Sequence, residues 1–438
     1  MQKKYSKNKI KSVYVAFSSD ILNEGHINIL KKAKKYGKVI VGLLTDKAIT
    51  EYKRLPHLNY DQRKVILKNL KYVDEVIVQK TLDYSENLKQ IKPHYVVHGD
   101  DWKKGIQAPV RKKVKKIIKK WSGKLIEIPF THNIEEKAFK KKNISTGTTP
   151  EVRKAKLTRL LDAKKIVRFL EGHNALSGLI IENTSLIKNN KYSEFDGMWS
   201  SSLTDSTSRG KPDNQSVDIS VRLSGLNEIL DVTTKPIIFD ADNGGRPEHF
   251  GYTVKSLERA GVSAVIIEDK IGLKKNSLFQ NQSGAQQDSI QKFCEKIKIG
   301  NKSKITEDFF IIARIESFIL GKSLKDALSR AEAYSKAGAD AILIHSKENT
   351  PKQIFSFARK FKKSKFFKPM VAVPSTYSDT SEDKLIQEGF QIVIYANHML
   401  RAAYPAMVNV AQKILQDKKS SKIEKKLSSI KEILNLIN

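Results

Sequence analysis

The chain has 438 residues, of which 39% are apolar, and this share is large enough to form buried cores rather than a disordered chain. A single core rarely extends beyond about 300 residues, so we expect two domains. No apolar run is long enough to cross a bilayer, and the basic N-terminal segment lacks the apolar centre of a secretory signal. The single cysteine, Cys294, rules out an internal disulfide framework. We therefore expect a cytoplasmic protein that does not span a membrane.

The net charge of +33, from 80 basic and 47 acidic residues, is open to two interpretations. A basic surface can bind nucleic acid through its phosphates. Here the lysines are spread through every region, and neither zinc-finger spacing nor an RNA-recognition pattern of aromatic residues accompanies them. We therefore interpret the charge as lysine-rich surfaces and expect no nucleic-acid partner; a basic nucleic-acid-binding protein on an inactive barrel is the alternative from another class. Either way, the positive field favours anionic substrates.

The first part of the chain alternates apolar strands with amphipathic helices. We predict strands at residues 13–17, 39–46, 74–79, 94–101 and 123–129, and helices from about residue 24, at 61–70 and at 109–121. This alternation is typical of a parallel, Rossmann-like sheet with helices on both faces. A polar stretch with Gly147 and Pro150 follows. We place the first domain at 1–140, a linker at 141–157 and the second domain at 158–438.

The second part repeats the strand–helix unit eight times, which predicts a (β/α)8 barrel. The eight strand candidates are residues 166–174, 195–201, 235–242, 263–270, 309–317, 340–346, 370–376 and 390–398. Nearly every one ends in polar or charged residues, and the active sites of such barrels lie at the carboxyl ends of the strands. Residues after Met407 are expected to be helical.

The segment FDADNGG (239–245) holds the strongest cluster of chemistry-bearing residues. Side chains two apart on a strand point to the same side, so Asp240 and Asp242 are expected to converge. Two carboxylates on one face repel unless a cation lies between them, and Mg2+ prefers oxygen ligands. Acidic residues that only begin a turn are the alternative for this segment alone.

The next two strands add charged residues at the same rim. Glu268 would emerge beside the aspartates, and Lys274 and Asn276 lie on the loop that follows, where they could cover an anionic substrate and exclude water. Arg314 ends the next strand and offers a planar fork for a phosphate or carboxylate. Together these residues indicate a site for a metal ion and an anionic substrate.

From Glu171 to about Ile430 the chain resembles the phosphoenolpyruvate mutase branch of the isocitrate lyase superfamily. The matching segments agree in order and spacing: EGHNALSG (171–178), GMWSSSLTDS (197–206), FDADNGG, EDKIGLKKNS (268–277), ARIESF (313–318), RAEAYSKAGADAILIHSK (330–347) and YANHMLRA (395–402). The resemblance implies an α/β barrel that assembles as a homotetramer or dimer and exchanges a C-terminal helix between copies.

The resemblance also implies roles for individual residues. Mg2+ or another divalent cation would be held by Asp240, Asp242 and Glu268, with Asp213 close to the site. The substrate carboxylate would be held by Ser201 and the backbone of Ser202, the phosphoryl group by Arg314, and Trp199 would line the pocket. The gating loop would carry Lys274, Asn276 and Ser277. His345 and His398 could be ligands at the rim or buried structural residues, and we interpret both as structural.

The implied reaction interconverts phosphoenolpyruvate and phosphonopyruvate and would supply downstream enzymes of phosphonate biosynthesis. Two other activities of the superfamily are the alternatives. The carbon–carbon lyases of the superfamily use a cysteine in the loop after the fourth strand, and Cys294 lies downstream of that loop. Phosphonopyruvate hydrolase replaces the residue that corresponds to Asn276, so Asn276 favours the mutase. One departure is NGGRPE (243–248), where the family usually has TGYGN, which leaves the metal site intact but affects the nearby loop.

Residues 12–153 resemble the cytidylyltransferase-like nucleotidyltransferases, so the whole chain resembles bifunctional enzymes of phosphonate biosynthesis. The family's HxGH motif corresponds to residues 23–26, with Asn23 in place of the first histidine and His26 retained. The resemblance implies that CTP is a possible substrate of this domain. The nucleotide-binding candidates are Asn23, His26, Lys53, Arg63, Asp100, Asp101 and Trp102.

A second departure concerns the family's ISST motif, which contacts the triphosphate. Counting back from GTTPEVR (147–153) puts Ile134, Glu135, Glu136 and Lys137 in its place. Carboxylates there would repel a triphosphate, and asparagine at position 23 cannot carry the charge of an imidazolium. We therefore expect impaired cytidylyl transfer in the first domain.

Overall fold

The computed structural model describes residues 10–129, 131, 148–279 and 281–436. The chain divides into two compact units, one comprising residues 1–141 with 162–164 and 185–194, the other the remaining residues. Helix α7 (Pro150–Ala163) begins inside the stretch that the sequence analysis assigned to the linker. The boundaries at residues 140 and 158 stay a prediction.

The N-terminal unit contains a five-stranded parallel sheet in the order β3-β2-β1-β4-β5. Its strands are β1 (Ser12–Phe17), β2 (Lys38–Leu44), β3 (Glu75–Gln79), β4 (Tyr95–Gly99) and β5 (Lys124–Ile128). Its helices are α1 (Glu24–Lys34), α2 (Asp46–Thr50), α3 (Tyr60–Lys68), α4 (Ser85–Ile91) and α5 (Ala108–Ile118), with short 3-10 turns at Asp100–Lys103, Gly105–Gln107 and Lys119–Trp121. The predicted parallel, Rossmann-like sheet with helices on both faces is confirmed.

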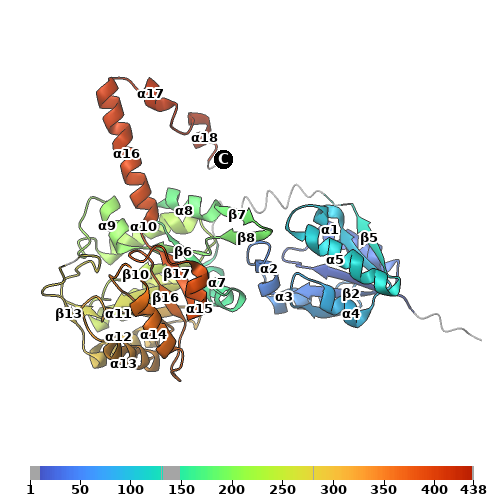
Figure 1. The fold of residues 1–438 in the computed structure, drawn as a ribbon, viewed down its shortest axis with the longest axis horizontal. Coiled ribbons are helices and arrows are strands. Elements are labelled where there is room, and N and C mark those ends of the chain that lie inside the picture. Colours follow the sequence, from blue (N-terminus) through green and yellow to red (C-terminus); the bar gives the residue numbers. More distant parts are fainter. Residues whose placement is uncertain (1–9, 130, 132–147, 280, 437–438) are drawn as a thin grey trace, which may run out of the picture. The chain divides into compact units, whose positions relative to one another are not determined.

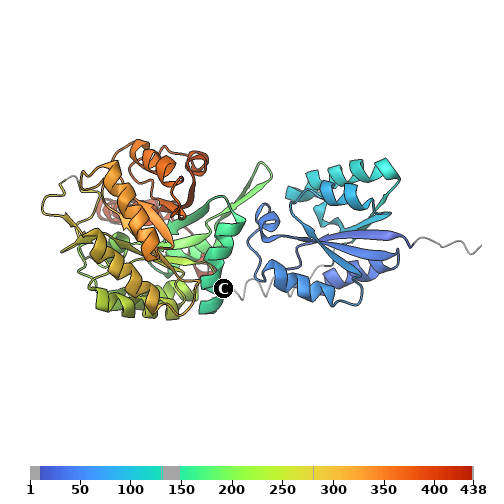
Figure 2. The ribbon, with the colours of Figure 1, turned by 90° about the horizontal axis from the view of Figure 1, so that it is seen from below.

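Alternation along β1 distributes its side chains between the two faces of the sheet. Val13, Val15 and Phe17 pack with residues of α1 and α3, whereas Tyr14 and Ala16 pack with residues of α2, α4 and α5. Figure 2 shows helices on both sides of these strands. The carboxyl ends of β1 and β4 therefore open toward the loops that carry the predicted nucleotide-binding residues.

The second unit is a closed barrel of eight parallel strands, as predicted. Around the barrel they are β6 (Val167–Glu171), β9 (Gly197–Ser200), β10 (Ile237–Asp240), β11 (Ala264–Glu268), β14 (Phe310–Ile315), β15 (Ala341–Ile344), β16 (Met370–Ala372) and β17 (Phe390–Tyr395). Two antiparallel hairpins were not predicted: β7 (Ser185–Lys188) with β8 (Lys191–Glu194), and β12 (Lys270–Ile271) with β13 (Gln286–Gln287). The second hairpin closes the base of the loop after β11.

The barrel strands are covered by helices, and the space between the two layers is the main apolar core (Figure 1). Besides α7, the helices are α8 (Ala175–Asn183), α9 (Ser202–Ser208), α10 (Ile219–Asp231), α11 (Pro247–Ala260), α12 (Ile290–Ser303), α13 (Leu324–Ala337), α14 (Lys352–Phe361) and α15 (Glu382–Glu388). Gly338 ends α13 with a φ of 106°, a backbone conformation that a glycine adopts without strain.

The chain continues with α16 (His398–Asp417), α17 (Ser421–Glu424) and α18 (Ile430–Leu434). Figure 1 shows α16 extending away from the barrel, and none of its residues is buried. Its base is attached to the barrel because the Glu171 carboxylate, at the end of β6, accepts hydrogen bonds from the backbone N–H groups of Met399 and Leu400. Within the described residues, no helix is both long and apolar enough to cross a membrane.

Candidate active site

A cavity of about 60 Å³ lies at the carboxyl ends of the barrel strands. Its wall combines side chains from β9, β10, β14, β15, β16 and β17 with residues of the loop after β11. The residues that line it are Trp199, Ser201, Ser202, Leu203, Asp213, Asp240, Lys274, Asn276, Ser277, Leu278, Arg314, Leu343, His345, Val373, Ser375, Ala396 and Asn397. Most of the predicted barrel-site residues therefore line one cavity; Asp242 and Glu268 do not.

The ammonium group of Lys274 is the centre of the acidic side of this cavity. It contacts the Asp242 carboxylate and Ser202 Oγ, and it lies 3.1 Å from Asp213 Oδ1 and 3.9 Å from Asp240 Oδ2. Ser202 donates its hydroxyl hydrogen to Asp240 Oδ2 at 2.9 Å. These contacts join the loop after β11 to the ends of β9 and β10.

Arg314 lies on the other side of the cavity, at the end of β14. Its Nε donates to Glu316 Oε1 at 2.6 Å, and its Nη2 donates to Ser277 Oγ at 2.8 Å. The buried ammonium of Lys270 donates to Ser277 Oγ at 2.9 Å and to the Lys275 carbonyl at 2.7 Å. The guanidinium and the covering loop are thus held in one network.

Asn276 completes the cover. Its Nδ2 donates to Asp213 Oδ2 at 2.6 Å, so the loop after β11 is bonded to the segment between α9 and α10. Ser277, on the same loop, contacts Glu316, which directly follows β14. With Lys274, Asn276 and Ser277 in these positions, the loop closes the cavity toward solvent.

Burial and the dense charge together shift the acid–base properties of the site. Burial alone would raise the pKa of Asp240, but the cations of Lys274, Arg314 and Arg222 hold it below its ordinary value. Burial raises the pKa of Glu268 to about 7, although Arg314 partly opposes the shift. Burial and the Arg314 cation lower the pKa of His345 to about 3, so this imidazole is neutral. The cavity therefore combines fixed positive charges with acidic groups of unequal strength.

The acidic side chains fit a hard divalent cation by their chemistry. Asp213, Asp240 and Asp242 supply oxygen donors around one point, and Glu268 lies on the neighbouring strand. Asp213 Oδ1 and Glu268 Oε1 are buried and accept no hydrogen bond within the described residues, but they form ion pairs with Lys274 Nζ at 3.1 Å and Lys270 Nζ at 3.5 Å. Both oxygens thus lie where a cation is already favoured. With Lys274 between the aspartates, no three acidic or histidine side chains of the described chain converge as a preformed metal site.

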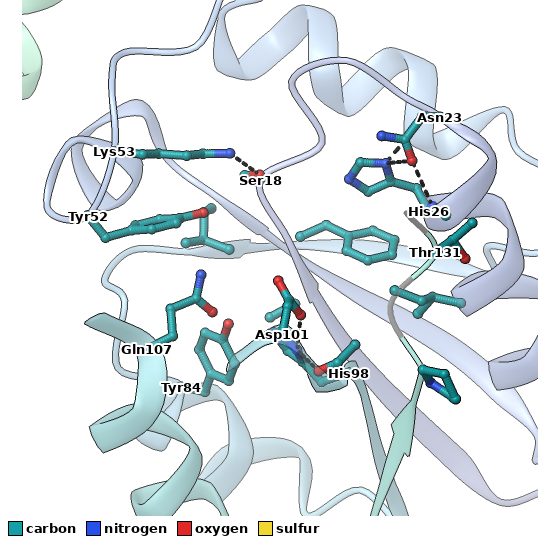
Figure 3. A pocket seen from close by; sticks show the side chains of 17 residues that line it. Ser18, Asn23, His26, Tyr52, Lys53, Tyr84, His98, Asp101, Gln107 and Thr131 are labelled. Carbon is teal, nitrogen blue, oxygen red and sulfur yellow. Dashed lines mark hydrogen bonds and ion pairs between the residues drawn. The ribbon is translucent and has the colours of Figure 1, made fainter. Parts of the chain in front are cut away.

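The N-terminal unit has a larger cavity, of about 320 Å³, at the carboxyl ends of β1 and β4. Figure 3 shows two bonded pairs on one side, Lys53 with Ser18 and Asn23 with His26, and Asp101, Gln107 and Tyr84 on the other. Lys53 Nζ donates to Ser18 Oγ at 2.8 Å. Asn23 Oδ1 accepts from the backbone N–H of His26 at 3.2 Å, which caps α1.

An aromatic stack supports the floor of this pocket. The rings of His98 and Trp102 lie parallel, with centroids 3.8 Å apart, and Tyr84 stacks beside both. Trp102 Nε1 donates to Glu127 Oε1 at 2.8 Å, which holds the indole in place. Burial lowers the pKa of His98 and raises the pKa of Tyr52 to about 12, so both side chains are neutral near pH 7. The floor is therefore flat, aromatic and uncharged, except for Asp101.

Comparisons with known proteins identify the family of the barrel. Residues 157–415 match the profile of the phosphoenolpyruvate phosphomutase family. The chain belongs to this family. It is 36% identical over 282 residues to the phosphoenolpyruvate phosphomutase of Tetrahymena pyriformis, an alignment that covers 64% of this chain and 89% of that protein. It superimposes on the crystal structure of phosphoenolpyruvate phosphomutase from Streptomyces platensis subsp. rosaceus with a TM-score of 0.60 and 34% identity, over 65% of this chain and 94% of that one.

Two further similarities bear on chemistry and on the first domain. A phosphonopyruvate hydrolase, crystallised with oxalate and Mg2+, is 32% identical to this chain, with a TM-score of 0.58, over 66% of this chain and 95% of that one. Residues 18–154 match a cytidylyltransferase-like profile. Family membership therefore includes relatives with both mutase and hydrolase names, joined here to a cytidylyltransferase-like unit.

The structure corrects two arguments about the barrel. Strand β10 ends at Asp240, and Asp242 follows in a turn with a φ of 55°, so the two carboxylates are not brought together by a shared strand face as predicted. Both reach the same lysine because the turn folds back toward the loop after β11. His345, predicted to be structural, lines the cavity, and His398, predicted to be buried, is exposed at the start of α16. Nothing in the local sequence distinguishes these two histidines.

The predicted nucleotide-binding residues of the N-terminal unit fall into two groups, those that line the pocket and those that do not. Asn23, His26, Lys53 and Asp101 line the pocket, but Arg63, Asp100 and Trp102 do not. The guanidinium of Arg63 is fully buried and donates to the carbonyls of Ser18, Leu44 and Leu58 and to the Asp46 carboxylate. A role of Arg63 in nucleotide binding stays a prediction. Sequence analysis missed Ser18, Tyr52, Tyr84, His98 and Gln107, which also line the pocket. Residues 134–137, predicted to occupy the place of the second phosphate motif, lie outside the described residues.

Proposed function

We propose that the barrel interconverts phosphoenolpyruvate and phosphonopyruvate within its closed cavity. The observation that carries this proposal is the position of the loop after β11. Lys274, Asn276 and Ser277 bond to the acidic residues and to Arg314 on opposite sides of one cavity. A site of this kind can hold a dianionic phosphoryl group, and it keeps bulk water away while a phosphorus bond is remade.

Each group has a role in this proposal. Arg314 binds the phosphoryl oxygens through its planar fork, and Ser201 with the backbone of Ser202 orients the substrate carboxylate. Asp240, Asp242 and Glu268 would hold Mg2+, with Asp213 nearby, and the bound ion would stabilise negative charge on the enolate oxygen of pyruvate. Trp199 contributes an apolar wall.

The reaction changes one bond for another. The bond between phosphorus and the enol oxygen breaks, and a bond between phosphorus and the methylene carbon forms, so no atom is gained or lost. Phosphoryl transfer passes through a loose, metaphosphate-like arrangement that any nearby water would capture. Asn276 and Lys274 therefore serve two purposes: they hold the phosphoryl oxygens during the transfer and occupy the space from which water would attack.

A phosphonopyruvate hydrolase remains the second candidate, because a protein of that name is 32% identical over the barrel. Phosphorus NMR of the full chain with phosphonopyruvate and Mg2+ separates the two reactions. A growing phosphoenolpyruvate signal supports the mutase. Release of inorganic phosphate and pyruvate as the main products would contradict it and support the hydrolase.

For the N-terminal unit we propose nucleotide binding with little transfer. The pocket has a size that suits a nucleoside, and its described lining includes the aromatic rings of His98 and Tyr84, the ammonium group of Lys53 and the imidazole of His26. Asn23 does not supply the first imidazole of the family motif. CTP is the nucleotide to test first, because the similarity of residues 18–154 points to cytidylyl chemistry.

The arm formed by α16 supports an assembly of several copies, dimer or tetramer. Tyr404, Met407 and Leu415 on this helix are 68%, 61% and 78% exposed. Large apolar side chains gathered on one projecting helix are costly to leave in water. We expect them to be covered by another copy of the chain, and light scattering of the purified protein would measure the oligomer size.

A further inference from the structure

Arg222, which the sequence analysis did not single out, is buried directly behind the acidic residues of the barrel cavity. It lies on the second turn of α10 and is 2% exposed. Its guanidinium carbon lies 4.3 Å from the centre of the Phe239 ring, on the strand that ends at Asp240. An arginine keeps its charge at every relevant pH, so a buried one must be matched by acceptors on all sides.

The acceptors of Arg222 belong to the segments that supply the site. Nη1 donates to the Asp240 carbonyl at 2.5 Å, Nη2 lies 3.5 Å from the Ser200 carbonyl, and Nη1 lies 3.6 Å from Asp242 Oδ2. Nε donates to Asp205 Oδ2 at 2.8 Å, on helix α9. One side chain therefore joins the ends of β9 and β10, the first turns of α9 and the acidic turn at Asp242.

Among the residues that Arg222 contacts, Asp242 most needs a stabilising partner. Its backbone has a φ of 55°, a conformation that non-glycine residues adopt only at some cost. Its carboxylate lies between two cations, Lys274 on the cavity side and Arg222 on the protein side. Lys274 is on a loop that must open to admit substrate, so Arg222 is the partner that stays in place throughout a turnover.

We propose that Arg222 is a positioning residue that holds the Asp240–Asp242 turn and the Ser200–Ser202 segment in the arrangement that binds the divalent cation and the substrate. This inference rests on the proposed function only for its effect on turnover; its effect on cation binding is independent of the reaction. Residues that orient metal ligands from behind typically change metal affinity by about 10- to 100-fold when replaced.

Arg153 provides a matched control. It is also 2% exposed, and its Nη2 donates to the carbonyls of Leu230 and Thr233, near the opposite ends of α10 and β10. Arg153→Met and Arg222→Met therefore both remove a buried guanidinium that donates to backbone carbonyls of the barrel unit. Only Arg222→Met removes a guanidinium that reaches the acidic turn at Asp242.

The experiment measures binding of Mg2+ alone to the full chain by calorimetry, together with kcat and KM and the midpoint of thermal unfolding. For Arg222→Met we expect the Kd for Mg2+ to rise by about 10- to 100-fold, with a matching fall in kcat/KM. Arg222→Lys keeps the charge but cannot make the fork of contacts, so an intermediate Kd is expected. Arg153→Met should lose stability and keep the parental Kd.

Several results would overturn the inference. One is a folded Arg222→Met variant with the parental Kd, and another is an equal rise in Kd for Arg153→Met. If Arg222→Met does not fold, Arg222→Lys decides: a parental Kd in that variant contradicts the positioning role. A parent that binds Mg2+ but does not isomerise phosphonopyruvate would refute the proposed function alone. A parent that does not bind Mg2+ would refute this inference.

Discussion

The barrel cavity and the N-terminal pocket differ in how their charged side chains are used. In the barrel, Lys274 and Arg314 bond across about 60 Å³ of space to acidic groups and to the covering loop. In the N-terminal unit, a pocket of about 320 Å³ keeps Lys53 and the Asn23–His26 pair on one side and Asp101 on the other. The first arrangement suits a reaction that must exclude water, and the second suits binding of a larger ligand.

This difference indicates what each unit requires from its residues. Charges concentrated in a small, buried volume interact strongly because little water screens them. Any one substitution among the charged groups of the barrel site should therefore change the rate by a large factor. In the N-terminal pocket Asp101 is exposed and Lys53 is half-buried, so water screens these groups and single substitutions should have smaller effects. The following predictions test this contrast, from the largest expected effect to the smallest.

Asp242→Asn should lower the rate of phosphonopyruvate isomerisation by about two to three orders of magnitude. Asparagine tolerates the positive φ at this position, so the variant removes the charge without straining the turn. Excess chelator should abolish turnover of the parent as well. The exposed Asp231→Asn, at the end of α10, is the matched control and should keep the parental rate. Full turnover in chelator would refute the metal requirement.

Asn276→Ala should slow isomerisation by about 100-fold and increase the share of inorganic phosphate among the products. The variant loses the 2.6 Å hydrogen bond to Asp213, which helps to close the loop, and it leaves space for water. Phosphorus NMR measures both products in one experiment. Asn281→Ala, on the same loop but exposed, controls for general loop effects. An unchanged rate in Asn276→Ala would show that the loop has another purpose.

Asn23→His should raise cytidylyl transfer by the N-terminal unit by about tenfold, because an imidazolium could then share the charge of the triphosphate. The full chain is incubated with CTP, Mg2+ and 2-aminoethylphosphonate or 2-hydroxyethylphosphonate, and pyrophosphate release is measured. Asp242→Asn, which inactivates the barrel, controls for pyrophosphate from other sources. A parent that turns over at about 1 per second or faster would show that Asn23 is tolerated, and the contrast between the two units would disappear.

Glu127→Gln should reduce the stability of the N-terminal unit by at most about 1 kcal/mol at pH 7. Hydrogen bonds from Arg111 and Trp102 lower the pKa of Glu127 to about 2, below its ordinary value of about 4.3. Because the pKa is lowered on folding, this stabilisation is present above pH 4.3 and is lost as the pH falls toward 2. Urea unfolding followed by tryptophan fluorescence tests it. The surface pair of Lys38 with Glu75 is the control, and Glu75→Gln should have a smaller effect.

The sequence predicted the architecture of both units because the apolar strands repeat regularly. Buried runs such as residues 264–268 and 341–344 are typical of strands that are buried on both faces, here by the barrel interior and by the surrounding helices, and the polar residues that end them mark the rim. Arg314, Lys274 and Asn276 could be found because they follow such strands. Their resemblance to a known family then suggested their roles.

Other residues could not be found from the sequence because their positions depend on packing between distant segments. Arg222 lies near the start of α10, and only the folded barrel brings it behind Asp240 and Asp242. Arg63 shows the reverse case. It was a nucleotide-binding candidate in the sequence analysis, yet folding buries its guanidinium among backbone carbonyls. His345 follows β15 and lines the cavity, whereas His398 begins α16 and is exposed.

The contacts of the loop after β11 have a consequence for kinetics. Lys274, Asn276 and Ser277 bond from this loop to side chains on both sides of the cavity, so the loop lies over the substrate's place. We therefore expect every catalytic cycle to include two excursions of this loop, one before the reaction and one after it. Each excursion must break the contacts of Lys274, Asn276 and Ser277 and move the segment through solvent. The turnover number should accordingly fall as sucrose or glycerol raises the viscosity of the medium, and a slow substrate analogue should show no such dependence.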